Sequence, residues 1–159
     1  MTKEKLGEVI IDKEDSLYRI AKTLLYNDAD CADAIQESIV KAFSSVDTLR
    51  NHNYVKTWLV RILMNECYSI MRKEKKFVSL DSIMENAYYE DNEYIDLYKA
   101  VADLPTDLKI AVSLYYSEGF SIKEIAKLED TTESSIKNRL FRARKRLKLM
   151  LKEEEAINL

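Results

Sequence analysis

Apolar residues recur every three or four positions along most of the 159-residue chain. Three such segments lie in the first half, at about residues 12–25, 31–43 and 53–72, and this spacing puts their apolar side chains on one helix face. Asp12 and Asp15 resemble a capping pair at the start of the first segment. The pattern predicts three helices packed into one small domain.

The second half shows the same spacing in four segments. The first ends at Pro105, which stops it or opens the next helix, and Gly119 suits the C-cap of the second. Ser121 caps a short third helix, with Glu124 placed three residues later as in a capping box. After a tight turn at residues 129–131, Thr132 caps a long last helix. We expect a second helical domain here.

Composition favours an all-α fold. With 2 Gly and 1 Pro, the chain has too few turn-forming residues for a many-stranded sandwich or barrel. The same shortage leaves no glycine-rich phosphate loop. Hydrophobic residues at 47% suffice for a core, and charged residues at 33% suit exposed helix faces.

Reactive side chains are few. Cys31 and Cys67 lie within apolar helical patterns and are expected to be buried free thiols in a reducing compartment. His52 is the single histidine, which removes most catalytic triads and zinc centres. We therefore expect no enzyme activity, no metal and no cofactor. The N-terminus lacks the pattern of a signal peptide and no apolar run is long enough to span a membrane, which predicts a cytoplasmic protein.

Charge is arranged in blocks, although the net charge is only −3. Residues 79–96 hold six acidic side chains and no basic one, whereas residues 136–152 hold eight basic side chains and no acidic one. Such asymmetry indicates a polyanionic partner for the basic segment. Because like charges repel, we expect residues 79–93 to be an extended linker, with a short helical piece around Ile83 and Met84.

The last two helices form a helix-turn-helix pattern, in which the second helix enters the major groove of DNA. Short polar side chains at its start and cations beyond suit base edges and phosphates. A merely solvated basic face is the alternative, which eight cations without an anion disfavour. The candidate contacts are Ser134, Ser135, Lys137, Asn138, Arg139 and Arg142.

Two blocks of the chain resemble the bacterial sigma factors of the sigma-70 family. Residues 121–126 (SIKEIA) and 135–144 (SIKNRLFRAR) are similar to the fourth conserved region of these proteins. Residues 33–37 (DAIQE) and 56–65 (KTWLVRILMN) resemble regions 2.2 and 2.3 to 2.4. Both blocks in this order, with no room for a domain between them, look like the extracytoplasmic-function (ECF) group.

The resemblance implies an alternative sigma factor that binds core RNA polymerase, recognises −35 and −10 promoter elements and assists promoter melting in a cell-envelope or stress response. The implied partners are the β′ clamp helices and β flap of the polymerase, promoter DNA and an anti-sigma factor, which in some relatives is anchored in the membrane. The implied parts are an N-terminal tail (1–11), a three-helix region 2 (12–78), the acidic linker (79–93), region 4 with the helix-turn-helix (94–152) and a C-terminal tail (153–159).

Residue roles are implied by matching positions. The six candidates on the last helix become −35 contacts, chief among them Lys137, Arg139 and Arg142. The implied polymerase contacts are Asp33, Gln36 and Glu37. The implied −10 binding and melting residues are Arg50, Asn51, His52, Asn53, Tyr54, Arg61, Asn65, Arg72 and Lys73. We expect Trp58 to be a core residue, whereas Phe141 either flanks the core or touches a thymine methyl.

The alternative function is a helix-turn-helix regulator that binds operator DNA without polymerase. It predicts tight, sequence-specific DNA binding by the free protein as a dimer. A sigma factor of this type is instead expected to bind promoter duplex poorly until polymerase positions both domains. A small helical enzyme has little support from the residues present.

Overall fold

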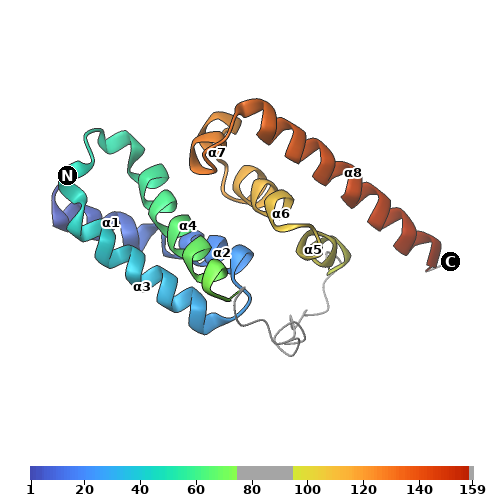
Figure 1. Ribbon diagram of the computed structural model, residues 1–159, viewed down its shortest axis with the longest axis horizontal. Helices are drawn as coiled ribbons and strands as arrows, with labels where there is room; N and C mark the ends of the chain where they lie inside the picture. Colours follow the sequence, from blue (N-terminus) through green and yellow to red (C-terminus); the bar gives the residue numbers. More distant parts are fainter. Residues whose placement is uncertain (75–94, 158–159) are drawn as a thin grey trace. The chain divides into compact units, whose positions relative to one another are not determined.

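The computed structural model describes residues 1–74 and 95–157, and every regular element in these ranges is a helix (Figure 1). The chain divides into two compact units, Met1–Phe77 and Val78–Leu159. The all-α prediction is therefore confirmed. The predicted linker, including the piece around Ile83 and Met84, lies outside the described residues.

Unit 1 is built from four helices and two short 3-10 turns. The core is made by α2, α3 and α4, which pack on one another, with α3 and α4 side by side (Figure 1). Leu17, Ala34 and Leu63 are among its buried side chains. The elements are α1 (Lys3–Asp12), α2 (Glu14–Leu24), α3 (Asp28–Ser44), η1 (Val46–Thr48), η2 (His52–Tyr54) and α4 (Val55–Glu74).

The predicted N-terminal tail is a helix, so that prediction is wrong. The Thr2 side chain caps α1 by accepting a hydrogen bond from the Lys5 amide at 3.1 Å. Leu6 and Ile10, one helical turn apart, are buried against the rest of the unit. Asp12 is the last residue of α1, so it does not cap the following helix. Lys13 occupies the N-cap position of α2 without a side-chain bond.

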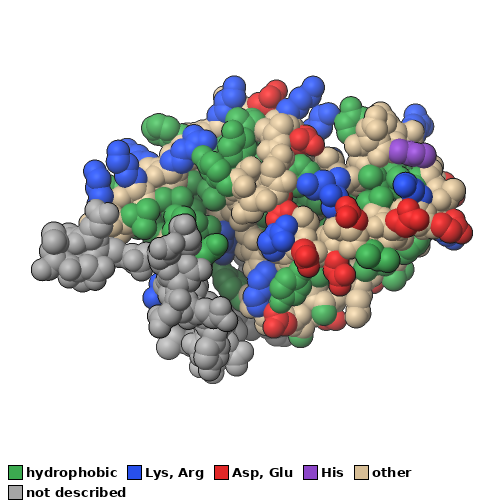
Figure 2. All heavy atoms as spheres, turned by 180° about the vertical axis from the view of Figure 1, so that it is seen from behind, with side chains coloured by type: hydrophobic (Ala, Val, Ile, Leu, Met, Phe, Trp, Pro, Cys, Tyr) green, Lys and Arg blue, Asp and Glu red, His purple; other side chains and the backbone are tan. Residues whose placement is uncertain are grey.

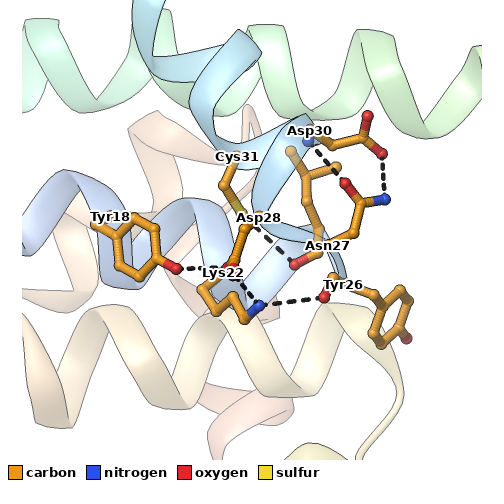
Figure 3. A network of polar contacts seen from close by, with 8 residues as sticks. Tyr18, Lys22, Tyr26, Asn27, Asp28, Asp30 and Cys31 are labelled. Atoms are coloured by element: carbon orange, nitrogen blue, oxygen red, sulfur yellow. Dashed lines mark hydrogen bonds and ion pairs between the residues drawn. The ribbon is translucent and has the colours of Figure 1, made fainter. Parts of the chain in front are cut away.

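A surface network joins the end of α2 to the start of α3 (Figure 3). The Asn27 side chain caps α3 by accepting from the Asp30 amide at 2.7 Å. Tyr18 Oη and Lys22 Nζ both donate to Asp28 Oδ1, at 2.6 and 2.8 Å. Hydrogen bonds from Lys22 and Tyr18 lower the pKa of the Asp28 carboxyl. Helix α3 thus begins at Asp28, three residues before the segment that the spacing predicts from about residue 31.

Unit 2 packs three short helices against one long helix. Helices α5, α6 and α7 all contact α8. Ile136, Leu140 and Ala143 on α8 are fully buried, as their spacing predicts. The elements are α5 (Ile95–Ala102), α6 (Thr106–Val112), the π-helical turn η4 (Ser113–Ser117), α7 (Ile122–Leu128) and α8 (Glu133–Ile157). Because α8 continues to Ile157, the predicted C-terminal tail is largely helical.

A π-helical turn separates α6 from α7. The Glu118 amide bonds to the Ser113 carbonyl at 3.0 Å, one residue further back than in an α-helix. Glu118 is the C-cap residue, and Gly119 follows it with φ +73°, the left-handed position after a helix end that favours glycine. This extra residue rotates the chain, so that Leu114 is buried while Tyr116 is 57% exposed.

Candidate nucleic-acid interface

The helix-turn-helix begins with a complete capping box on α7. The Ser121 hydroxyl accepts from the Glu124 amide at 3.1 Å, and the Glu124 carboxylate accepts from the Ser121 amide at 3.0 Å. Ile125 and Leu128 are buried side chains of α7. The predicted box is confirmed.

The turn between α7 and α8 depends on one left-handed residue. Asp130 has φ 52°, which a non-glycine residue adopts only when its surroundings hold it there. The Asp130 amide bonds to the Lys127 carbonyl at 3.3 Å, and the Thr131 amide to the Ala126 carbonyl at 2.9 Å. Thr132 then caps α8 by accepting from the Ser135 amide at 3.0 Å, as predicted.

The first turns of α8 present one polar and basic row to solvent. Ser134, Lys137 and Asn138 are exposed on the side opposite buried Ile136. Phe141 lies in the same row and is 63% exposed, so it is not a core residue. Ser135 is partly buried. In the part of the chain that the structure describes, Lys137 makes no ion pair.

Of the three main −35 candidates, the two arginines face other parts of unit 2. Arg142 lies 3.8 Å from Asp107 of α6, with both side chains about half exposed. Arg139 is only 19% exposed and lies 4.0 Å from Glu129, which is 10% exposed. The structure therefore separates Arg139 from the exposed row to which the sequence assigns it.

Further along α8, Arg144 is held against the π-helical turn. Its Nε donates to Tyr116 Oη at 2.7 Å, and its guanidinium lies 5.7 Å from the Tyr116 ring centre. Tyr115 meets that ring edge-on, with centroids 4.9 Å apart. Tyr116 is therefore an exposed tyrosine paired with a cation.

In unit 1 the five consecutive −10 candidates form a single exposed loop. The exposed histidine, purple in Figure 2, begins its 3-10 turn. The Asn51 side chain shapes the turn by accepting from the Asn53 amide at 3.0 Å. Leu49 and Val46 anchor the preceding residues in the core. The exposed loop residues are Arg50, Asn51, His52, Asn53 and Tyr54.

One face of α4 continues the polar surface. Arg61, Asn65 and Arg72 are exposed and lie opposite the buried residues of the helix. Lys73 is exposed beside them. Trp58 and Tyr68 are half-buried. Trp58 lies three residues before Arg61 and Tyr68 three residues after Asn65, so both fall on the same helix face. The sequence treats Trp58 as core and misses Tyr68, although the alternation of spacings places both on this face.

A third exposed row runs along α3. Asp33, Gln36 and Glu37 are exposed, while Ala34 and Ser38 on the opposite side are buried. Val40, one turn beyond Gln36, is 58% exposed. The sequence pattern does not single out Val40, which gives this polar face an apolar residue.

Both thiols are free and buried, as predicted. Burial raises the pKa of the Cys67 thiol to about 12. Within the described residues, no group of three or more His, Cys, Asp or Glu side chains is arranged to hold a metal ion. None of the described helices has the length and apolar character needed to cross a membrane.

Family comparison accounts for both units. Residues 11–77 match the family model described as sigma-70 region 2, and residues 94–147 match sigma-70, region 4. The chain belongs to the sigma-70 family of sigma factors.

Curated relatives assign this sigma factor to the ECF group. It is 34% identical to "RNA polymerase sigma factor SigV" of Bacillus subtilis (strain 168), covering 97% of this chain and 95% of the relative. It is 26% identical to "ECF RNA polymerase sigma factor SigM" of the same organism, covering 86% and 88%. These matches favour an alternative sigma factor over an operator-binding regulator that works without polymerase.

Solved structures share the fold of this sigma factor. Sigma factor RpoE, solved in complex with the anti-sigma factor NepR from Bartonella quintana, superposes with a TM-score of 0.77 at 28% identity, covering 94% of this chain and 98% of RpoE. CnrH, solved in complex with the cytosolic domain of CnrY, gives a TM-score of 0.69 at 20% identity, covering 96% of this chain and 90% of CnrH. The second likeness is one of fold alone.

Proposed function

We propose that this ECF sigma factor binds core RNA polymerase and directs initiation at promoters whose −35 and −10 elements it recognises. The exposed row at the start of α8, held in place by a complete helix-turn-helix, supports a −35 site most strongly. A recognition helix presents its first turns to the major groove in this motif. The proposed −35 contacts are Ser134, Ser135, Lys137, Asn138 and Arg142.

Unit 1 supports two further proposed surfaces. The loop at residues 50–54 and the outward face of α4 combine cations, amides and aromatic rings, which suits an unstacked single strand. We assign the −10 element and melting to Arg50, Asn51, His52, Asn53, Tyr54, Arg61, Asn65, Arg72 and Lys73. We assign core polymerase binding to the α3 row, Asp33, Gln36 and Glu37.

An anti-sigma factor is a further proposed partner. The relative RpoE was solved with one, and the exposed α3 row and the basic face of α8 are the surfaces that such a protein would cover here. A complex that leaves both surfaces exposed to solvent would contradict this. We also propose that the sigma factor works in the cytoplasm and has no catalytic chemistry or cofactor of its own.

The test is transcription in vitro with the full chain, sigma-free core polymerase and fragmented genomic DNA. We expect discrete 5′ ends that share upstream −35 and −10 motifs. Lys137→Gln together with Arg142→Gln should abolish them. Lys152→Gln is the matched control, since it removes a charge from the same helix about 22 Å beyond Lys137. Tight DNA binding by the chain alone, without specific starts, would instead support the operator-binding regulator.

A further inference from the structure

The Arg139 side chain has an unusual position among the cations of α8. It is 19% exposed, whereas the Arg142 side chain is 51% exposed. It follows buried Ile136 by three residues and precedes buried Leu140 by one. At about 100° per residue, it therefore lies at the edge of the core stripe, while Lys137 and Asn138 lie on the outer side.

Glu129, the partner of Arg139, stands where the chain reverses direction. It follows the last residue of α7, its amide bonds to the Ile125 carbonyl at 2.9 Å, and its side chain is 10% exposed. The next residue, Asp130, has the left-handed φ of 52° on which the turn depends. The pair therefore joins α8 to the turn that sets the position of α8 relative to α7.

We propose that Arg139 is a positioning residue that holds the α7–α8 turn through Glu129 and does not contact DNA. This inference rests on the proposed function. The Arg139 side chain is only 19% exposed and faces Glu129, so contact with a base or phosphate would require it to leave this ion pair and turn outward, which removes an attraction at the turn. Kept together, the pair fixes how the exposed row of α8 meets the groove.

The Glu129→Gln variant distinguishes a DNA-contacting Arg139 from one that holds the turn, because the two roles predict opposite changes in promoter affinity. If Arg139 contacts DNA, removing Glu129 frees the arginine and raises promoter affinity. If Arg139 holds the turn, Glu129→Gln lowers affinity about 10-fold, as does Arg139→Gln, and the double variant is no worse than either single one. Arg139→Lys, which keeps the charge, should recover part of the loss.

Binding is measured with holoenzyme made from full-length variants and a promoter fragment taken from the transcript mapping above, over a range of salt concentrations. Lys137→Gln is the reference, and it should reduce the salt slope by about 0.9 because one phosphate contact is lost. Arg139→Gln and Glu129→Gln should leave the slope unchanged. If Arg139→Gln reduces the salt slope, or if Glu129→Gln raises promoter affinity, the positioning role of Arg139 is wrong. The proposed function of the protein is not affected by that result.

Amide hydrogen exchange in the free full-length protein gives a second readout that needs no DNA. The Asp130 and Thr131 amides, both hydrogen-bonded in the turn, should exchange faster in Arg139→Gln and Glu129→Gln but not in Lys137→Gln. Unchanged exchange in both variants overturns the inference. If Lys137→Gln leaves promoter binding unchanged, α8 is not the DNA-contacting helix and the proposed function falls with it.

Discussion

At the scale of single residues, Asp107 forms an ion pair with Arg142, one of the proposed −35 contacts. Their side chains are 3.8 Å apart and about half exposed, so water and salt screen the attraction. A phosphate that approaches Arg142 must replace this partner. If Arg142 makes the −35 contact proposed above, Asp107 weakens the DNA affinity of the helix that it faces.

We predict that Asp107→Asn raises holoenzyme affinity for promoter DNA about 2- to 5-fold, the range of an exposed ion pair. Fluorescence anisotropy with a labelled promoter fragment measures it. Asp103→Asn, which removes an exposed acidic side chain of the same unit, should change affinity less. Equal gains in both variants would mean that overall charge, not this pair, is responsible.

Glu74 supplies a pH dependence at the end of α4. A hydrogen bond with the Asp30 carboxylate raises the pKa of Glu74 to about 7, from its ordinary 4.5. Folded chains thus hold a proton that unfolded chains release between about pH 4.5 and 7. Because the folded state binds more protons in that window, the free energy of unfolding falls as pH rises through it.

The Glu74→Gln variant should lose this dependence. We expect its melting temperature to exceed that of the wild-type chain at pH 8 and to approach it at pH 5, since the amide needs no proton to bond to Asp30. Thermal unfolding followed by circular dichroism at both pH values checks this. A constant difference between the two proteins would contradict the prediction.

At the scale of elements, α3 combines a polar row with one exposed apolar side chain. Val40 is 58% exposed beside Gln36 and Glu37. Apolar side chains surrounded by polar ones are typical of protein interfaces. This makes Val40 the residue of α3 best suited to anchor the proposed polymerase contact.

We predict that Val40→Asp weakens binding to core polymerase about 10-fold or more, because burying a valine side chain contributes about 1.5 kcal/mol. Competition with a labelled wild-type chain for core polymerase provides the measurement. Ile11→Asp is the matched control, because this isoleucine is 75% exposed on α1, which is not part of the proposed polymerase contact. If both variants bind normally, α3 does not dock through Val40.

At the scale of the whole molecule, two small binding units share one chain with a net charge of −3. The proposed DNA contacts are divided between the two units, and a net negative chain is repelled by DNA. Two linked modules gain affinity only when both can engage their sites at once. Polymerase, by holding both units, would provide that geometry.

We therefore predict that the free chain binds a promoter duplex at least about 100-fold more weakly than holoenzyme does, consistent with the loss of simultaneous engagement. Titrations in the same buffer measure both affinities. A control duplex with scrambled −35 and −10 elements should bind the free chain equally well. Preference of the free chain for the intact promoter would indicate an autonomous regulator.

Local signals explain which parts of the structure could be predicted. The box at Ser121, the cap at Thr132 and the left-handed Gly119 each depend on neighbours a few residues away, so their positions follow from the sequence. Helix α1 has only a weak sequence signal because its buried residues are Leu6 and Ile10. The role of Arg139 depends on Glu129, ten residues earlier, and only folding reveals which charges meet.

The two buried thiols have a practical consequence. Both cysteines of the chain lie in unit 1 and none lies in unit 2. An alkylating reagent reacts with a thiolate that is exposed to solvent. While unit 1 is closed, Cys67 is buried and its pKa is raised to about 12, so its thiol is neither exposed nor deprotonated. The rate at which intact chains gain label, followed by mass spectrometry, thus records how often region 2 opens, whether or not region 4 is engaged elsewhere.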